Sequence, residues 1–176
     1  MKKSRKYQKE LFNILASLKI IKVLFANTPA YMNKNITIII AEDDDGHAFL
    51  IKRNLSRSGV INPIIHFRDG EEVLNFFNRI NSAEHADPEK GYIVLLDIKM
   101  PRIDGTEVLE KMKSDPVLKK IPIIMITTTN APAEVELCHK LGCNSYIVKP
   151  IDYNKFIDVV KKLGYFLEIV EIPNAG

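Results

Sequence analysis

Residues 36–45 read ITIIIAEDDD, an apolar run that ends in four consecutive acidic residues. A β-branched run without polar alternation is typical of a strand whose two faces are both covered. Four further apolar runs follow, at 63–67, 92–96, 121–126 and 145–148. The chain therefore predicts five short strands that are buried in one sheet.

Between these runs lie segments whose apolar residues recur at helical spacing. The predicted helices span 46–58, 70–80, 105–113, 132–141 and 152–163. Five successive strand–helix units indicate a parallel sheet with right-handed crossovers. We therefore expect a flavodoxin-like doubly wound α/β fold with five parallel strands in the order 2-1-3-4-5 and helices on both faces.

A chain of 176 residues with 46% hydrophobic and 27% charged residues is typical of one globular domain. We assign that domain to residues 36–163, with an N-terminal extension at 1–35, a surface loop at 81–91 and a C-terminal tail at 164–176. Two cysteines exclude a disulfide-rich secreted scaffold, and no run reaches the roughly 18 apolar residues of a membrane span. A cytoplasmic location is therefore expected.

The net charge of +3 conceals an uneven distribution, because residues 1–34 carry +7 and the rest of the chain carries −4. We expect neither nucleic acid nor a membrane as a partner of the acidic domain. The role of residues 1–31 stays open between a signal peptide, a membrane-surface helix and a partner-facing helix. Lys19 and Lys22 interrupt the apolar stretch of this segment, which argues against a signal peptide.

Polar side chains gather where the predicted strands end. Glu42 and Asp43 follow the first strand, Asp97 the third, Thr127 ends the fourth and Lys149 follows the fifth. The carboxyl ends of parallel strands meet at one edge of such a sheet. Three carboxylates there repel one another by roughly 3 kcal/mol per pair, at about 5 Å and an effective dielectric of about 20. Mg²⁺ would offset this repulsion, since it takes carboxylate and phosphate oxygens as ligands.

Asp97 is the best nucleophile of this set, because it stands alone after the central strand. Carboxylates form acyl-phosphate intermediates in several enzyme classes. The oxygens of a transferring phosphoryl group need neutralisation, which Mg²⁺, Lys149 and the Thr127 hydroxyl would share. The pattern therefore predicts phosphoryl transfer to Asp97.

One set of residues resembles the signature of response-regulator receiver domains: Glu42-Asp43, Asp97, Thr127 and Lys149-Pro150. The intervals of 30 residues from Asp97 to Thr127 and 22 from Thr127 to Lys149 fit the family, and residues 95–105 are similar to its phosphorylation-site motif. The resemblance covers residues 36–163. It implies a two-component response regulator in which Asp97 accepts phosphate from a phosphohistidine of a sensor histidine kinase. The output would be a changed protein-binding surface.

The same resemblance implies a ligand set for Mg²⁺. Asp43, Asp97 and the backbone carbonyl of Lys99 would hold the ion, and Glu42 would reach it through water. The only reactions expected of the chain are its own phosphorylation and dephosphorylation, so it is not expected to be an enzyme in the usual sense.

The resemblance also implies a switch. Thr127 would move toward the new phosphoryl group, and Tyr146 would swing inward and change the surface of the fourth helix and fifth strand. For Tyr146 a plain packing role is the alternative. Lys99 and Thr129 border the phosphorylation site and are candidates for tuning dephosphorylation.

The loop at 81–91 and the tail at 165–170 resemble single-domain regulators that serve bacterial phytochrome kinases. This resemblance implies a phytochrome kinase as the partner. It also implies a homodimer, formed through the face of the fourth helix, fifth strand and fifth helix or through the tail at 164–176.

Three other interpretations remain. Asp43-Asp44-Asp45 superficially fits the DxD motif of phosphoaspartate hydrolases, although position 47 is His where that motif prefers Thr or Val. A phosphate-independent interaction module would not need the complete set of site residues. A flavodoxin is disfavoured, because its first loop must accept phosphate and this loop is acidic.

Two smaller expectations concern local structure. Asp45 is expected to cap the first helix of the domain. Cys138 and Cys143 are expected to be buried packing residues rather than metal ligands, because His139 alone does not complete a metal site.

Overall fold

The computed structural model describes residues 36–82 and 90–167, so the expectations for 1–35, for 83–89 of the surface loop and for 168–176 of the tail lie outside the described residues. Five strands form the sheet: β1 (Ile36–Ala41), β2 (Ile64–Phe67), β3 (Gly91–Leu96), β4 (Ile123–Thr127) and β5 (Ser145–Val148). Five helices and one 3₁₀ turn connect them: α2 (Asp45–Arg57), α3 (Gly70–Ser82), α4 (Gly105–Ser114), η1 (Leu118–Lys120), α5 (Pro132–Lys140) and α6 (Tyr153–Leu167).

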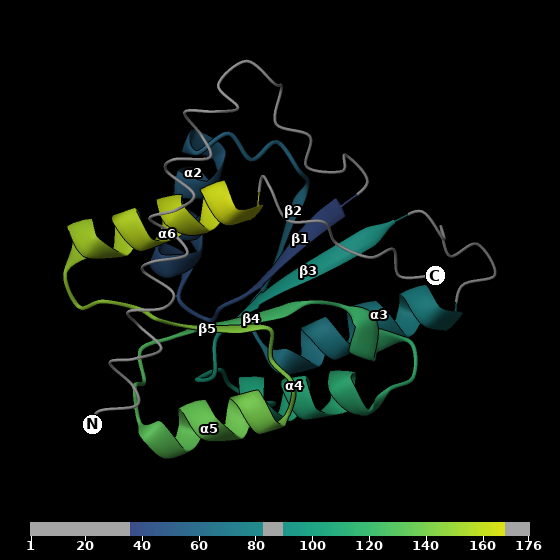
Figure 1. Ribbon diagram of the computed structural model, residues 1–176. Helices are drawn as coiled ribbons and strands as arrows, with labels where there is room; N and C mark the ends of the chain where they lie inside the picture. The colour runs from purple at the N-terminus through teal and green to yellow at the C-terminus, as the bar shows by residue number, and fades with distance from the viewer. Residues whose placement is uncertain (1–35, 83–89, 168–176) are drawn as a thin grey trace.

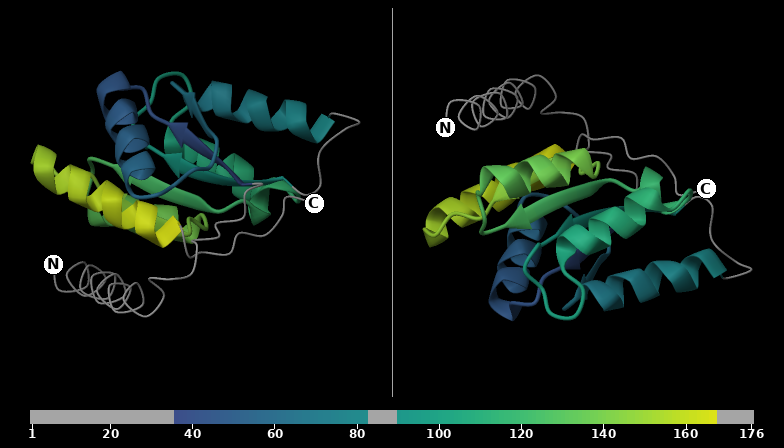
Figure 2. Two further views of the ribbon diagram at one scale, coloured as in Figure 1. Left: turned by 90° about the horizontal axis from the view of Figure 1, so that it is seen from above. Right: turned by 90° about the horizontal axis from the view of Figure 1, so that it is seen from below.

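The strands are all parallel and lie in the order β2-β1-β3-β4-β5, which confirms the predicted flavodoxin-like topology. Helices α2 and α6 cover one face of the sheet, and α3, α4 and α5 cover the other (Figures 1 and 2). Because both faces are covered, every residue of the central strands β1 and β3 is buried.

Side chains of successive strand residues enter opposite layers of the core. Ile39 and Val94 pack with the α3–α4–α5 layer, whereas Ile38 and Ile40 pack with the α2–α6 layer. The core therefore covers both faces of the sheet, and the functional groups follow at the strand ends.

The fourth strand begins two residues later than the sequence predicted. The turn η1 occupies 118–120, and Asp115 Oδ1 accepts hydrogen bonds from the N–H groups of Val117 and Leu118 at its start. The ladder of β4 starts only at Ile123, whose N–H donates to Asn144 Oδ1 at 2.9 Å. Tertiary contacts therefore set this boundary.

The last helix was predicted over about 152–163, and α6 runs from Tyr153 to Leu167, so the first residues of the predicted tail extend this helix. Its final turns pack on α2, where a side-chain carbon at Gly164 would come within 2.6 Å of Ser58 Cβ. Leu163 and Leu167 are buried in the same layer. Helix α3 also runs two residues past its predicted end, to Ser82, so the first residues of the predicted surface loop are helical.

The predicted cap of α2 is also wrong by one residue. Asp44 is the N-cap, and its Oδ1 accepts the His47 backbone N–H at 2.7 Å. Asp45 is the first helical residue and binds the Arg68 guanidinium through both carboxylate oxygens.

Cys138 and Cys143 are unpaired and buried, as expected. Burial raises the pKa of each thiol to about 11. Within 36–82 and 90–167, no helix has the length and apolar character needed to cross a bilayer.

Asp104 caps α4 and gives a pH-dependent prediction. Its Oδ1 accepts from the backbone N–H groups of Thr106 and Glu107, both at 2.9 Å, and from the Thr106 hydroxyl at 2.6 Å. Partial burial opposes ionisation, but these hydrogen bonds outweigh it and hold the pKa of Asp104 below 3.8. Asp104→Ala is therefore expected to lower the free energy of unfolding by about 1 kcal/mol at neutral pH.

The carboxylate has a lower pKa folded than unfolded, so its contribution is complete above 3.8 and is lost as the pH falls through the folded value. Urea titrations should therefore show the wild type and Asp104→Ala converging in stability toward acid pH. Asp104→Asn is the control, since asparagine still caps a helix. A difference that stays constant from neutral to acid pH would contradict the role given to the ionised cap.

Candidate functional site

The strand ends bring three carboxylates together. Asp97 follows β3 and Glu42 follows β1, and the two strands are joined there by the Asp97 N–H, which donates to Ala41 O at 2.9 Å. Glu42, Asp43 and Asp97 each offer one oxygen within 4.8 Å of the others. Glu42 and Asp97 are buried and Asp43 is exposed.

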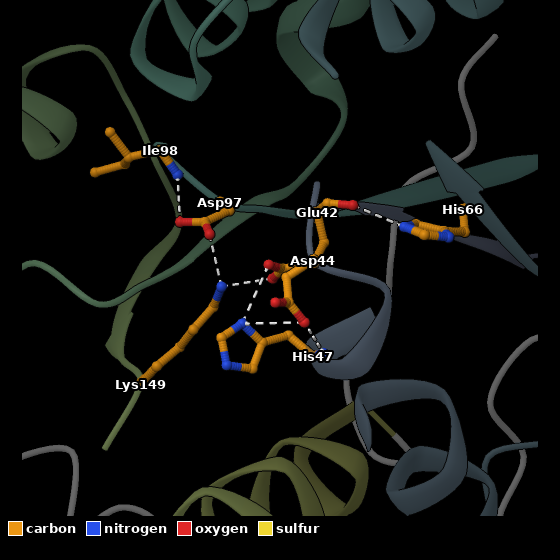
Figure 3. Close-up of polar contacts among 7 residues, drawn as sticks. All are labelled: Glu42, Asp44, His47, His66, Asp97, Ile98 and Lys149. Carbon is orange, nitrogen blue, oxygen red and sulfur yellow. Dashed lines mark hydrogen bonds and ion pairs between the residues drawn. The ribbon is translucent and has the colours of Figure 1, made fainter. Parts of the chain in front are cut away.

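Lys149 supplies the positive charge of this site. Its Nζ lies 2.6 Å from Asp97 Oδ2 and 2.5 Å from Glu42 Oε2, and the residue is only 4% exposed (Figure 3). Its backbone is fixed by the Lys149 N–H, which donates to Thr127 O at 2.7 Å. One buried ammonium therefore bridges two buried carboxylates from β1 and β3.

Glu42 is the most constrained carboxylate. Burial raises the pKa of Glu42 above 4.5, and the charge and hydrogen bond of Lys149 offset this only in part. Its Oε1 is buried and has no hydrogen-bond partner among the described residues, although His47 Nδ1 lies 3.4 Å away. The Glu42 backbone is held by β2, since the His66 Nε2–H donates to Glu42 O at 2.8 Å.

Asp97 is held by the loop that follows it. Its Oδ1 accepts the Ile98 N–H at 2.7 Å. The first residue of α4, Gly105, lies against the backbone of Asp97. A Cβ at this position would lie 1.9 Å from Asp97 O, so only glycine fits there. Within this loop Arg102 adopts a φ of 64°, and its guanidinium lies 3.3 Å from the buried carboxylate of Asp69.

Thr127 and Tyr146 lie beside this cluster without joining it. Thr127 is fully buried, and its hydroxyl has no hydrogen-bond partner in the part of the chain that the structure describes. The Tyr146 hydroxyl instead donates to Thr129 O at 3.2 Å, and burial raises the pKa of this phenol above 10. Lys99, whose carbonyl the resemblance assigns to the metal, lies two residues after Asp97 with its side chain exposed.

The structure adds one residue that the sequence reasoning did not select. His47, in the first turn of α2, points its ring at Glu42 and Asp44 (Figure 3). Its place two residues after the acidic run 42–45 was the available signal, but a single histidine does not by itself indicate a site.

The donor set fits a hard divalent cation. Oxygen atoms from three carboxylates converge, and Asp43 leaves one side of the cluster open to solvent. Mg²⁺ and Mn²⁺ prefer such oxygen ligands and keep several waters.

Residues 38–161 match the family described as the response regulator receiver domain. Response regulator Rcp1 of Synechocystis is 29% identical over 139 residues, which cover 78% of this chain and 93% of that protein. A receiver domain structure from Rhodospirillum rubrum is 36% identical with a TM-score of 0.74, over 78% of this chain and 97% of that one.

The phosphorylated cyanobacterial phytochrome response regulator RcpA is 29% identical with a TM-score of 0.70, over 78% of this chain and 98% of that one. The family match and the strand order agree over the domain. The chain belongs to the response regulator receiver domain family.

Proposed function

We propose that this chain is a phosphorylation-controlled switch of a two-component system, in which Asp97 accepts phosphate from a sensor histidine kinase. The observation that carries the proposal is the buried Lys149 ammonium, bound to both Asp97 and Glu42 with Asp43 alongside. A buried carboxylate beside a buried cationic side chain and an acidic cluster suits a site in which the carboxylate attacks phosphorus while positive charge neutralises the phosphoryl oxygens.

Asp43, Asp97 and the backbone carbonyl of Lys99 would hold Mg²⁺, with Glu42 reaching it through water. When bound, the ion would supply positive charge to the phosphoryl oxygens. The acidic cluster supports this assignment, as does the relative Rcp1, which has a Mn²⁺-bound form.

In the proposed transfer, a carboxylate oxygen of Asp97 attacks phosphorus and forms a P–O bond. The P–N bond to the donor imidazole breaks, and its electron pair stays on that nitrogen. The Lys149 ammonium leaves the Asp97 carboxylate for a phosphoryl oxygen, and the Thr127 hydroxyl, which has no partner within the described ranges, donates to another. Hydrolysis of the acyl phosphate by water resets the site.

Thr127 and Tyr146 carry the proposed output. Movement of Thr127 toward the phosphoryl group would open room for Tyr146, which would give up its hydrogen bond to Thr129 O and change the α5–β5 surface. This surface with α6, or the C-terminal tail, is the proposed homodimer contact. Phytochrome-associated relatives support a phytochrome kinase as the donor, and a cytoplasmic location is proposed for this chain.

The hydrolase interpretation is not favoured. Its DxD motif needs the second aspartate at the reaction site, whereas Asp45 is bound to Arg68 in an exposed ion pair. Asp44 is engaged as the cap of α2. Neither residue is therefore available beside Asp43.

Incubation with acetyl phosphate tests the proposal through metal removal. With Mg²⁺ present, intact mass should increase by one phosphoryl group, about 80 Da. After chelation with EDTA the adduct should disappear, because the three carboxylates then repel the incoming phosphate. Size-exclusion chromatography of both forms would report the dimer contact. An adduct of equal yield with and without the metal would contradict the proposed site.

A further inference from the structure

The carboxylate of Glu42 has two oxygens in unequal surroundings. Oε2 is bound by Lys149 at 2.5 Å. Oε1 is buried, and among the described residues it has no hydrogen-bond partner. The ring nitrogen Nδ1 of His47, at 3.4 Å, is the group that faces it.

The His47 ring is held in this position from two sides. Its backbone N–H donates to the capping carboxylate of Asp44 at 2.7 Å, which fixes the residue in the first turn of α2. The ring also packs edge-on against Phe156 of α6, with centroids 5.7 Å apart and planes at 72°. Figure 3 shows the imidazole pointing from the helix into the acidic cluster. Packing therefore aims Nδ1 at Glu42.

The Lys149 ammonium cannot bind Glu42 and a phosphoryl oxygen equally well at the same time. In the proposed transfer its ammonium moves from Asp97 to a phosphoryl oxygen, which weakens its contact to Glu42 and leaves His47 as the other side chain that faces this carboxylate. A buried carboxylate that loses its donors is strongly disfavoured. A second donor on Oε1 would keep Glu42 oriented toward the metal throughout the cycle.

We infer that His47 is a positioning residue for the metal site: its Nδ1 faces Glu42 Oε1 at 3.4 Å, and this polar contact holds the carboxylate for its water-mediated contact to Mg²⁺. This inference rests on the proposed function and extends it to a residue outside the family signature. Groups that orient a metal ligand typically change metal affinity by about 10- to 100-fold when removed, and the lower figure applies here because Glu42 reaches the ion through water.

Two substitutions of His47 distinguish the loss of its ring N–H donor from the loss of its packing against Phe156. His47→Leu keeps a side chain of similar bulk against Phe156 but removes the donor. His47→Asn keeps an amide nitrogen near the position of Nδ1, because both nitrogens are bonded to Cγ. His139→Leu, at an exposed histidine of α5, is the matched control.

The affinity of the unphosphorylated full chain for Mg²⁺ is measured by calorimetry. We expect His47→Leu to weaken binding about tenfold, and His47→Asn to recover most of the loss. His139→Leu should bind as the wild type does. With acetyl phosphate, His47→Leu should need more Mg²⁺ for half-maximal phosphorylation but should reach a near-normal rate at saturation.

Unchanged Mg²⁺ affinity in His47→Leu overturns the inference, and so does equal weakening in His47→Leu and His47→Asn, which would indicate packing alone. A wild-type chain that fails to bind Mg²⁺ overturns the proposed metal site itself. The two failures are therefore distinguishable. Circular dichroism of each variant verifies that α2 and α6 stay folded.

Discussion

Asp97→Asn is expected to abolish the covalent phosphate completely. The amide is not a nucleophile toward phosphorus and cannot form an acyl phosphate. It keeps the size of the side chain and an oxygen that can accept the Ile98 N–H, which lies 2.7 Å from Asp97 Oδ1. Lys149 retains its contact to Glu42. Intact mass after incubation with acetyl phosphate and Mg²⁺ should therefore show no adduct on a folded chain.

Asp43→Asn is the matched comparison. This substitution removes one proposed metal ligand but leaves the phosphoacceptor, so the adduct should form more slowly and recover as Mg²⁺ is raised. A phosphoaspartate hydrolase would give the reverse pattern, with the covalent intermediate lost in Asp43→Asn and kept in Asp97→Asn. That reverse pattern would replace the proposed function by the hydrolase.

Lys149→Met is expected to produce the second large effect, on two separate measurements. The ammonium compensates both Glu42 and Asp97, and removing one partner of a buried ion pair typically lowers the free energy of unfolding by about 3–5 kcal/mol. Loss of a donor to the phosphoryl oxygens should also slow phosphorylation by about 100-fold or more. Urea unfolding in metal-free buffer and the rate of adduct formation measure the two effects.

The double variant Lys149→Met with Glu42→Gln separates the effect on stability from the effect on the rate of phosphorylation. It leaves one fewer uncompensated buried charge, so much of the stability should return while phosphorylation stays slow. Lys155 is an exposed residue in the first turn of α6, and Lys155→Met should change neither measurement. If Lys149→Met were as stable and as quickly phosphorylated as the wild type, the proposed role of the ammonium would be wrong.

The alternation of apolar and amphipathic segments in the sequence was enough to predict the fold. Strands such as 36–41 are β-branched and apolar on both faces, which only a covered parallel sheet can bury. The convergence of Glu42, Asp43, Asp97 and Lys149 followed from the same pattern, because parallel strands with right-handed crossovers bring their carboxyl ends to one edge.

The cap of α2 and the end of α6 depended on contacts between segments that are distant in the sequence. Either Asp44 or Asp45 suits a helix cap, and the pairing of Asp45 with Arg68, 23 residues away, accompanies the choice of Asp44. The end of α6 is set by its packing on α2 near Ser58, which a periodic pattern along one helix does not contain.

By itself, the sequence determined the class of fold, the strand order and the residues gathered at the strand ends, since these depend on periodicity and on chain connectivity. The tertiary structure alone decided how the charges pair. Lys149 reaches Glu42 across 107 positions, and His47 is turned toward Glu42 by Phe156 of another helix. Such pairings depend on distances of a few ångströms between side chains from different elements, which no spacing along the chain specifies.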